Sequence, residues 1–458
     1  TDLGKWLPEQ LKFTAPFYYS RAKAVSTPKY DPYNEDMELD ETLESYSTKT
    51  QRDSIRDMVQ TIDKMRSMSL SGVRFNIKSR HSMPWDPANF SVSYSQNLKE
   101  SKDPTTQYER DNVYKASFNY NWNPYFKPLK LVGKDSKTKS RLIHDFQFNW
   151  LPNSISMSSN WNRSYYAQQL RNVDTYESDY EIPVTYSKKF TWLRQTSISW
   201  DITKQLKTNF SAATNSRINE PDAPVNKQLY PDEYEAWKDT VMLQLWKLGT
   251  PVDYNQSFDL TWNIPLNKLK ATNWITASVK YKSTYQWNRG TRIDEETETG
   301  NTLQNSAQWQ IDGRFNFETL YNKNKYLKKV NDKFRIKKNA STKALNNKKG
   351  NRKAEVNKKA PDGKEIDVKS KIQDKKKRDR KDNEIMMYVA RVLMMTRNVQ
   401  VNYKTTNDTY LPSFRPNSGD FFGQSNSDAS GLAPGLGFAF GFEGGVDFTR
   451  KAIANEWL

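Results

Sequence analysis

The sequence predicts an all-β protein: an antiparallel transmembrane β-barrel with long loops and two short helical insertions. Three observations predict this class. Apolar and polar residues alternate with period two in about a dozen segments. Aromatic residues make up 13% of the chain, although apolar residues of all kinds reach only 35%. Several alternating segments end in Trp beside a Pro turn.

The composition excludes several chemistries. The chain has no Cys and two His, so disulfides, Cys nucleophiles and Cys-based zinc sites are impossible. No run of 18 apolar residues is present, and we expect no transmembrane helix. The first residue is Thr and no signal-like segment follows, so we expect a mature chain or one excised from a larger protein.

Residues 1–48 are predicted to contain an entry strand around Phe13–Tyr19, followed by an acidic loop. The stretch Asp31–Glu44 holds seven acidic residues and no basic residue. Its spacing matches no EF-hand loop and lacks the turn glycine, so a solvated loop is favoured over a calcium site.

Residues 49–70 are predicted to form an amphipathic helix. Thr50 and Asp53 have the spacing of a capping-box variant. The apolar residues that follow fall on one helical face at Ile55, Met58, Val59, Ile62 and Met65.

Residues 71–322 are predicted to form transmembrane strands. The longest alternation runs from Ile275 to Trp287, and other strands also approach the roughly 9–11 residues that cross a bilayer at a tilt. A helical loop is predicted near 230–249, beginning at Pro231 and ending at Gly249.

Two architectures produce such strands. A soluble sandwich buries the apolar face between two sheets, whereas a transmembrane barrel turns it toward lipid and encloses the polar face. Strand length, aromatic strand ends and Trp residues beside turns favour the barrel, because the Trp ring prefers the headgroup level of a membrane.

The alternation divides the predicted strands into two faces. The polar face of a barrel lines a hydrated lumen, and the aromatic residues mark the membrane interface. The predicted lumen-facing residues are Lys115, Asn119, Asp145, Gln147, Asn149, Lys280 and Lys282. The predicted membrane-interface aromatics are Trp122, Trp150, Trp200, Trp262, Tyr285 and Trp287.

Most of the net charge of +18 lies in one stretch. Residues 323–382 hold 24 Lys and Arg but only eight Asp and Glu, so this stretch carries 16 of those charges. We interpret it as a Lys-rich disordered insertion, with an arm for nucleic acid or an anchor for anionic lipid as the functional alternatives. Residues 383–458 are predicted to add further strands and a Gly-rich aromatic loop.

No catalytic constellation is recognised. His81 and His144 are isolated, and Gly-x-Ser-x-Gly, His-Glu-x-x-His and Walker patterns are absent from the sequence. We expect no enzymatic activity, no catalytic or metal-binding residues and no cofactor.

A series of short motifs, in order along the chain, resembles the SprA/Sov family. They include Leu7-Pro8-Glu9, Pro84-Trp85-Asp86, Leu151-Pro152-Asn153, Trp262-Asn263-Ile264-Pro265 and Leu411-Pro412. These are giant outer-membrane proteins of the type 9 secretion system and of gliding motility in Bacteroidota. They are much longer than 458 residues, so the chain resembles an internal section of one. The resemblance implies that this section is a wall segment of a very large transmembrane β-barrel.

The resemblance implies an outer-membrane location in a Gram-negative bacterium and a role in the translocon that exports folded cargo proteins. It implies a FadL-like outer-membrane partner, PorV, a periplasmic plug protein, cargo in transit and outer-membrane lipid, with no nucleic acid among the partners. Alternatives are an uptake porin or TonB-dependent receptor, and a soluble carbohydrate-binding β-sandwich protein.

Overall fold

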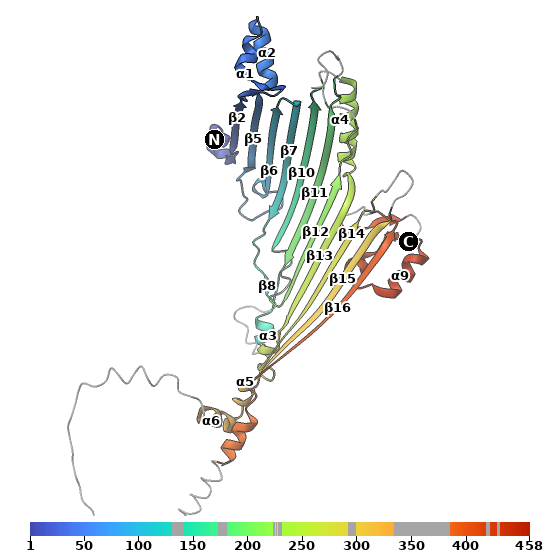
Figure 1. The fold of residues 1–458 in the computed structure, drawn as a ribbon. Helices are drawn as coiled ribbons and strands as arrows, with labels where there is room; N and C mark the ends of the chain where they lie inside the picture. The colour runs from blue at the N-terminus through green and yellow to red at the C-terminus, as the bar shows by residue number, and fades with distance from the viewer. Residues whose placement is uncertain are drawn as a thin grey trace, which may run out of the picture.

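The structure, a computed structural model, describes residues 1–130, 141–172, 181–222, 225, 227, 231–291, 299–333, 385–417, 422–427 and 431–458. The chain is mostly β, as predicted. Its long strands form one antiparallel sheet of twelve strands, which runs across the molecule in Figure 1.

The main sheet follows the chain almost in order, each strand pairing with the next, as expected where short or long loops join antiparallel neighbours. Its members are β1 (Phe13–Thr14), β2 (Phe17–Ser26), β5 (Thr61–Phe75), β6 (Phe90–Lys102), β7 (Thr106–Trp122), β10 (Ser154–Leu170), β11 (Thr185–Trp200), β12 (Leu206–Arg217), β13 (Thr250–Ile264), β14 (Ile275–Asn288), β15 (Asn301–Asn316) and β16 (Asn398–Phe414).

Shorter elements occupy the connections. Three two-stranded ribbons pair β3 (Tyr30–Asp31) with β4 (Asn34–Glu38), β8 (Leu129–Lys130) with β9 (Gln147–Phe148), and β17 (Ser425–Ser427) with β18 (Gly431–Ala433). The α-helices are α1 (Leu39–Glu44), α2 (Lys49–Val59), α3 (Arg141–His144), α4 (Pro231–Trp246), α5 (Phe317–Tyr321), α6 (Lys325–Lys333), α8 (Leu436–Ala439) and α9 (Gly445–Ala454), with a further helical segment at 385–393. Short 3-10 turns lie at Leu3–Trp6, Glu9–Leu11, Pro87–Asn89 and Pro265–Lys268.

The sheet is open in the described part of the chain. On one side it ends with β1 and β2, which both pair with β5, and on the other side it ends with β16. The outer backbone edges of β2 and β16 have no strand partner among the described residues, so no closed barrel is formed there.

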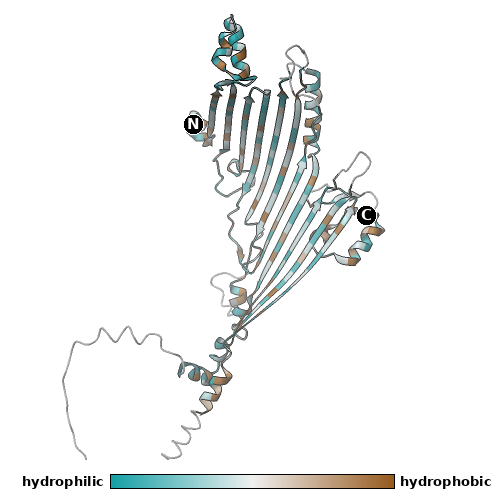
Figure 2. Ribbon diagram, viewed as in Figure 1, coloured by the Kyte–Doolittle hydropathy of each residue, from teal (hydrophilic) through white to brown (hydrophobic). Residues whose placement is uncertain are grey.

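Cross-strand register separates the side chains into two faces. Asn119 on β7 lies opposite Ser158, and the same row continues through Gln195, Ala213 and Asn255 to Gln286 on β14. Directly paired residues point to the same side of a sheet. Lys115, Asn119, Lys280 and Lys282 therefore share one face, which we call the polar face. Figure 2 shows the matching alternation of hydrophilic and hydrophobic residues along the strands.

The opposite side, the apolar face, carries the row that runs from Trp122 through Ile155, Ile198 and Phe210 to Phe258. Aromatic and β-branched residues dominate it, which is typical of strands that pack one face against an apolar environment. Period two in the sequence thus predicted the division into faces.

The predicted helix at 49–70 is wrong beyond residue 59. The helix is α2, capped by Thr48 rather than Thr50, and β5 begins at Thr61. Ile62 and Met65 fit a helical spacing, but pairing of β5 with both β2 and β6 supplies backbone hydrogen bonds on two sides. Tertiary pairing overrides local periodicity here.

Two further boundaries differ from the prediction. Residues 325–333, expected to be part of a disordered insertion, form helix α6, and the rest of that insertion, residues 334–382, lies outside the described residues, as do residues 383 and 384. The segment after it begins with helical residues 385–393, which pack on α6 through Ala390 and Met394 against Val330. The Gly-rich loop contains α8, and α9 follows it.

Candidate functional site

The polar face is hollowed across seven strands. A shallow cavity of about 650 Å³ extends from β7 to β15. Its polar-face lining consists mainly of neutral hydrogen-bonding side chains, including Asn119, Ser158, Gln195, Asn255 and Gln286. Such groups keep water at the surface and offer few apolar anchors to a passing molecule.

Two lysines of the polar face lie near opposite charges. Lys280 Nζ is 3.5 Å from Asp312 Oδ2, and Asp312 also accepts hydrogen bonds from Gln310 and Asn402. Lys282 lies opposite Asp259 in the register. The face is therefore polar without a concentration of one charge.

The apolar face carries an exposed, uncharged surface, which we call the apolar band. On β13 and β14 its positions from Phe258 to Ile264 and from Ala277 to Tyr281 contain no charged residue. The polar-face positions between them include Asp259 and Lys280. The large exposed members of the band are Val92, Phe118, Met157, Trp262, Trp309, Ile311, Val401 and Tyr403. A contiguous apolar surface of this kind indicates an interaction with a membrane or a partner.

The C-terminal residues 422–427 and 431–458 cover the apolar face of β12–β16 beside the band. Tyr254, Tyr285, Trp287 and Leu303 from the sheet form one core with Phe438 and other residues of this C-terminal segment. Figure 1 shows α9 beside the C-terminal end of β16. This is the largest hydrophobic cluster in the described residues.

Hydrogen bonds from the sheet hold the C-terminal segment at several points. Tyr285 Oη donates to the carbonyl of Gly423 at 2.8 Å, and Asn305 Nδ2 donates to the carbonyls of Phe438 and Glu443 at 3.0 and 2.9 Å. At Gly441, with φ +75°, an added Cβ would lie 2.8 Å from Ala307 Cβ. The positive φ and the close approach of this backbone to side chains of the sheet therefore require glycine at this position.

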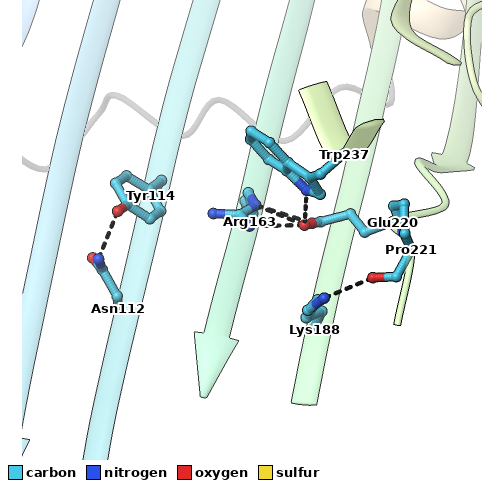
Figure 3. Close-up of polar contacts among 7 residues, drawn as sticks. All are labelled: Asn112, Tyr114, Arg163, Lys188, Glu220, Pro221 and Trp237. Atoms are coloured by element: carbon cyan, nitrogen blue, oxygen red, sulfur yellow. Dashed lines mark hydrogen bonds and ion pairs between the residues drawn. The ribbon is translucent and has the colours of Figure 1, made fainter. Parts of the chain in front are cut away.

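A second covering element, the loop that contains α4, is held on the apolar face by an ion pair (Figure 3). Arg163 on β10 donates to Glu220 Oε1 and Oε2, with Nε–Oε1 and Nη2–Oε2 distances of 2.9 and 2.7 Å. Trp237 of α4 donates to the same carboxylate at 2.8 Å, and its ring lies 5.0 Å from the guanidinium. Lys188 Nζ donates to the carbonyl of Pro221.

Apolar contacts complete the docking of α4. Trp192, Ile218 and Val241 form its core, with Trp161 and Trp237 packed against them. Arg194 binds the end of the helical loop by donating to the carbonyl of Leu248 at 2.9 Å. Sequence analysis missed the Arg163–Glu220 pair, although an arginine between Trp161 and Tyr165 on the apolar face was a signal that a buried partner exists.

The predicted lumen-facing residues fall into two groups. Lys115, Asn119, Lys280 and Lys282 lie together on the polar face, although what this face encloses remains a prediction. Asp145, Gln147 and Asn149 were predicted on a spanning strand, and this placement is wrong: they lie in the connection between β7 and β10, in and beside the two-residue strand β9, which pairs with β8. Asp145 Oδ2 is 3.3 Å from Lys268 Nζ, and Asn149 accepts from Trp200 Nε1.

Residues 145–150 form no spanning strand, because the two strands that they connect, β7 and β10, are already paired with each other. β7 pairs directly with β10 over its full length, so no edge is left between them for residues 145–150. Alternation over six residues matches a short ribbon as well as a spanning strand, which explains the wrong prediction.

The predicted interface aromatics also fall into two groups. Trp122, Trp200 and Trp262 lie on the apolar face toward one end of their strands, and Trp150 lies in the connection at that end. Trp262 is 46% exposed, whereas Trp122 is buried and donates to the carbonyl of Ser82.

Tyr285 and Trp287 lie at the opposite end of β14 and are buried beneath the C-terminal segment. The prediction that these two residues lie in a membrane interface is therefore wrong. Their alternation predicted the correct face, but the sequence held no signal that another segment covers it.

The described ranges of the chain contain no cluster of three or more His, Asp or Glu side chains arranged to bind a metal ion. They also contain no helix with the length and apolar character needed to cross a membrane.

The fold and its two faces define a class: a wide antiparallel sheet with one polar, hollowed face and one exposed apolar band. Comparison with known proteins adds a family. Residues 1–43 match the family SprA_N, described as motility related/secretion protein. This match relates the chain to secretion and motility proteins of the SprA type through its N-terminal segment. No curated protein matches the chain.

Proposed function

We propose that the chain forms part of the wall of an outer-membrane protein-conducting channel that exports folded cargo proteins in type 9 secretion and supports gliding motility. The observation that carries the proposal is the register, which places charged side chains on one face and an uncharged apolar band on the other at the same level of β13 and β14. The SprA_N match supports the assignment to secretion.

A wide channel is supported by the open edges of the sheet. Barrel diameter grows roughly linearly with strand number, and a sheet of twelve strands that does not bring β2 toward β16 fits a barrel with many more strands. In this proposal the polar face lines the lumen and the apolar band contacts outer-membrane lipid. Neutral Asn, Gln and Ser side chains then present a hydrated surface past which folded cargo moves.

The family resemblance supplies the proposed partners, a FadL-like protein of the PorV type and a periplasmic plug protein. The proposal includes no catalytic step, no cofactor and no nucleic acid. Its rival in the membrane is an uptake porin or TonB-dependent receptor, in which the hollow face passes small solutes.

A pair of matched substitutions tests the face assignment. Ile311→Arg places a charge in the apolar band, whereas Gln308→Arg places the same charge on the polar face of the same strand. Arg facing lipid near the bilayer midplane costs about 2–4 kcal/mol, so Ile311→Arg should reduce the heat-modifiable, membrane-assembled form of the complete protein. Gln308→Arg should assemble normally.

Equal assembly of the two variants would contradict the face assignment.

The class of cargo is tested separately by purifying the complex from cells that contain a secretion substrate fused to a stably folded domain. Recovery of the trapped fusion supports the secretion channel, whereas transport of small solutes without trapped protein favours the uptake alternative.

A further inference from the structure

The helical segment 385–393 is apolar on the side that faces away from the protein. Its positions 387, 390, 391 and 394 face α6, and Ala390 and Met394 are buried against Val330. The remaining side is formed by Ile385, Met386, Val389, Val392, Leu393 and Met395, whose exposed fractions range from 51% to 81%. Apart from Arg391, which donates to Asn331 of α6, the segment is apolar on both sides, and a helix of this kind is buried in its working environment.

Helix α6, which packs on this segment, is strongly basic. Lys325, Lys328 and Lys329 have the i, i+3, i+4 spacing that places residues on one side of a helix, and all three are exposed. Asp332 is the acidic residue of the same helix. We call α6 and residues 385–395 together the basal hairpin.

The basal hairpin continues the apolar face of the sheet. Phe315, at the end of β15, lies opposite Val399 on that face. From Phe315 a series of ring contacts runs to Phe317 at 6.4 Å and on to Tyr321 at 6.1 Å, and Tyr321 packs on the core of the hairpin. Tyr321 Oη also donates to the carbonyl of Thr396. Figure 1 shows the hairpin at the end of the sheet where β15 and β16 are joined.

We propose that the basal hairpin lies in the surface of an anionic phospholipid bilayer, with the apolar side of 385–395 among the acyl chains and the α6 lysines at lipid phosphates. Nine helical residues extend about 13 Å, too short to cross a hydrocarbon core of about 30 Å, so the segment lies along the interface. Lysines near the surface of an anionic leaflet add electrostatic attraction. The position of the hairpin relative to the bilayer depends on the proposed function, in which the apolar band lies in the same bilayer.

The absence of Cys in the chain permits a direct test. Single cysteines are introduced as Leu393→Cys in the hairpin, Ile311→Cys in the apolar band and Thr284→Cys on the polar face, and each carries an environment-sensitive fluorophore. The complete chain is reconstituted in vesicles of phosphatidylcholine with or without phosphatidylglycerol, and quenching by brominated acyl chains is measured. Heat-modifiable assembly identical to the unlabelled protein confirms that each labelled protein is folded.

Strong quenching at 393 and 311 but not at 284 supports the proposal. Quenching at 311 with none at 393 overturns the hairpin proposal and leaves the proposed function intact, whereas loss of quenching at both sites overturns both. A label at 393 that is shielded equally with and without brominated lipid identifies a protein as the occupant and also overturns the proposal.

The lysines are tested by a variant with Lys325→Gln, Lys328→Gln and Lys329→Gln combined. In the parent chain, quenching at 393 should be greater in phosphatidylglycerol vesicles than in phosphatidylcholine alone, and the variant should lose most of that difference. An undiminished difference would overturn the assignment of lipid phosphates to α6. Quenching at 311 should be the same in both chains.

Discussion

Arg163 on β10 and Glu220 in the connection before α4 form a two-bond ion pair, although they are 57 positions apart in sequence. Their side chains are 15% and 3% exposed, and the carboxylate accepts a further hydrogen bond from Trp237. The pair joins the apolar face of the sheet to the loop that covers it. The carboxylate is buried and the guanidinium is largely covered, so each charge depends on the other for compensation.

Removing one member of this pair should destabilise the α4 loop strongly. Glu220→Gln leaves the guanidinium of Arg163 without its counter-charge, and breaking a buried pair in this way costs about 3–5 kcal/mol. We expect faster proteolysis within residues 218–249 and a lower unfolding midpoint in denaturant. The double variant Arg163→Met with Glu220→Gln should be more stable than Glu220→Gln alone, and failure of this rescue would contradict the role of the pair.

Two tryptophans on the same face should respond differently to truncation. Trp287 is fully buried beneath the C-terminal segment, so Trp287→Ala should cost about 3–5 kcal/mol and release that segment to protease. Trp262, which is nearly half exposed, should lose little stability in detergent when it is replaced by Ala. Similar unfolding midpoints for the two variants would contradict the covering of the apolar face by residues 422–427 and 431–458.

The contact of the C-terminal segment with β15 can be tested by two glycine substitutions. Gly441 and Gly445 have positive φ values of 75° and 65°, but only at Gly441 would an added Cβ collide with the sheet, near Ala307. Both Ala variants carry the backbone strain, and Gly441→Ala also forces the two backbones apart. We expect a greater increase in the proteolysis rate of the C-terminal segment for Gly441→Ala, and equal rates would show that the approach is not close.

The loop that contains Asp86 should loosen at low pH. The Ser79 hydroxyl donates to this buried carboxylate and, together with the Met83 amide, lowers the pKa of Asp86 below its ordinary value. A lowered pKa in the folded state stabilises the loop above the unfolded pKa of about 3.9, and this contribution is lost as the pH falls through the folded pKa.

Hydrogen exchange of residues 76–89, corrected for intrinsic rates, should therefore increase between pH 5 and pH 2.5. Asp86→Asn should exchange faster at pH 5 and show little further change on acidification. A variant that keeps the pH dependence of the parent chain would assign it to another group.

Much of the fold could be predicted because the alternation of apolar and polar residues along a strand depends only on the local sequence. Alternation with period two identified β7, β13 and β14 and assigned Lys280 and Val279 to opposite faces, which the cross-strand register confirms. The same local rule failed at residues 145–150, because a short ribbon and a spanning strand share the alternation. Local spacing also failed at 61–70: Ile62 and Met65 satisfy helical spacing but lie on opposite faces of β5, whose pairing with β2 and β6 decides the structure.

The features that could not be predicted depend on contacts between segments that are distant in sequence. Burial of Trp287 depends on Phe438 and its neighbours, and compensation of Arg163 depends on Glu220. Neither partner can be identified from the residues beside it, because apolar packing is non-directional and any of many aromatic segments could cover the same face.

By itself, the sequence determined which side of each strand is polar and which is apolar, since successive side chains of a strand point to opposite faces. Only the tertiary structure decided how the apolar side is used. It divides that side into an exposed band around Trp262 and Ile311, a surface covered by the C-terminal segment, and an area closed by α4. The physical reason is that alternation fixes a direction, whereas burial depends on which distant segment occupies the space in that direction.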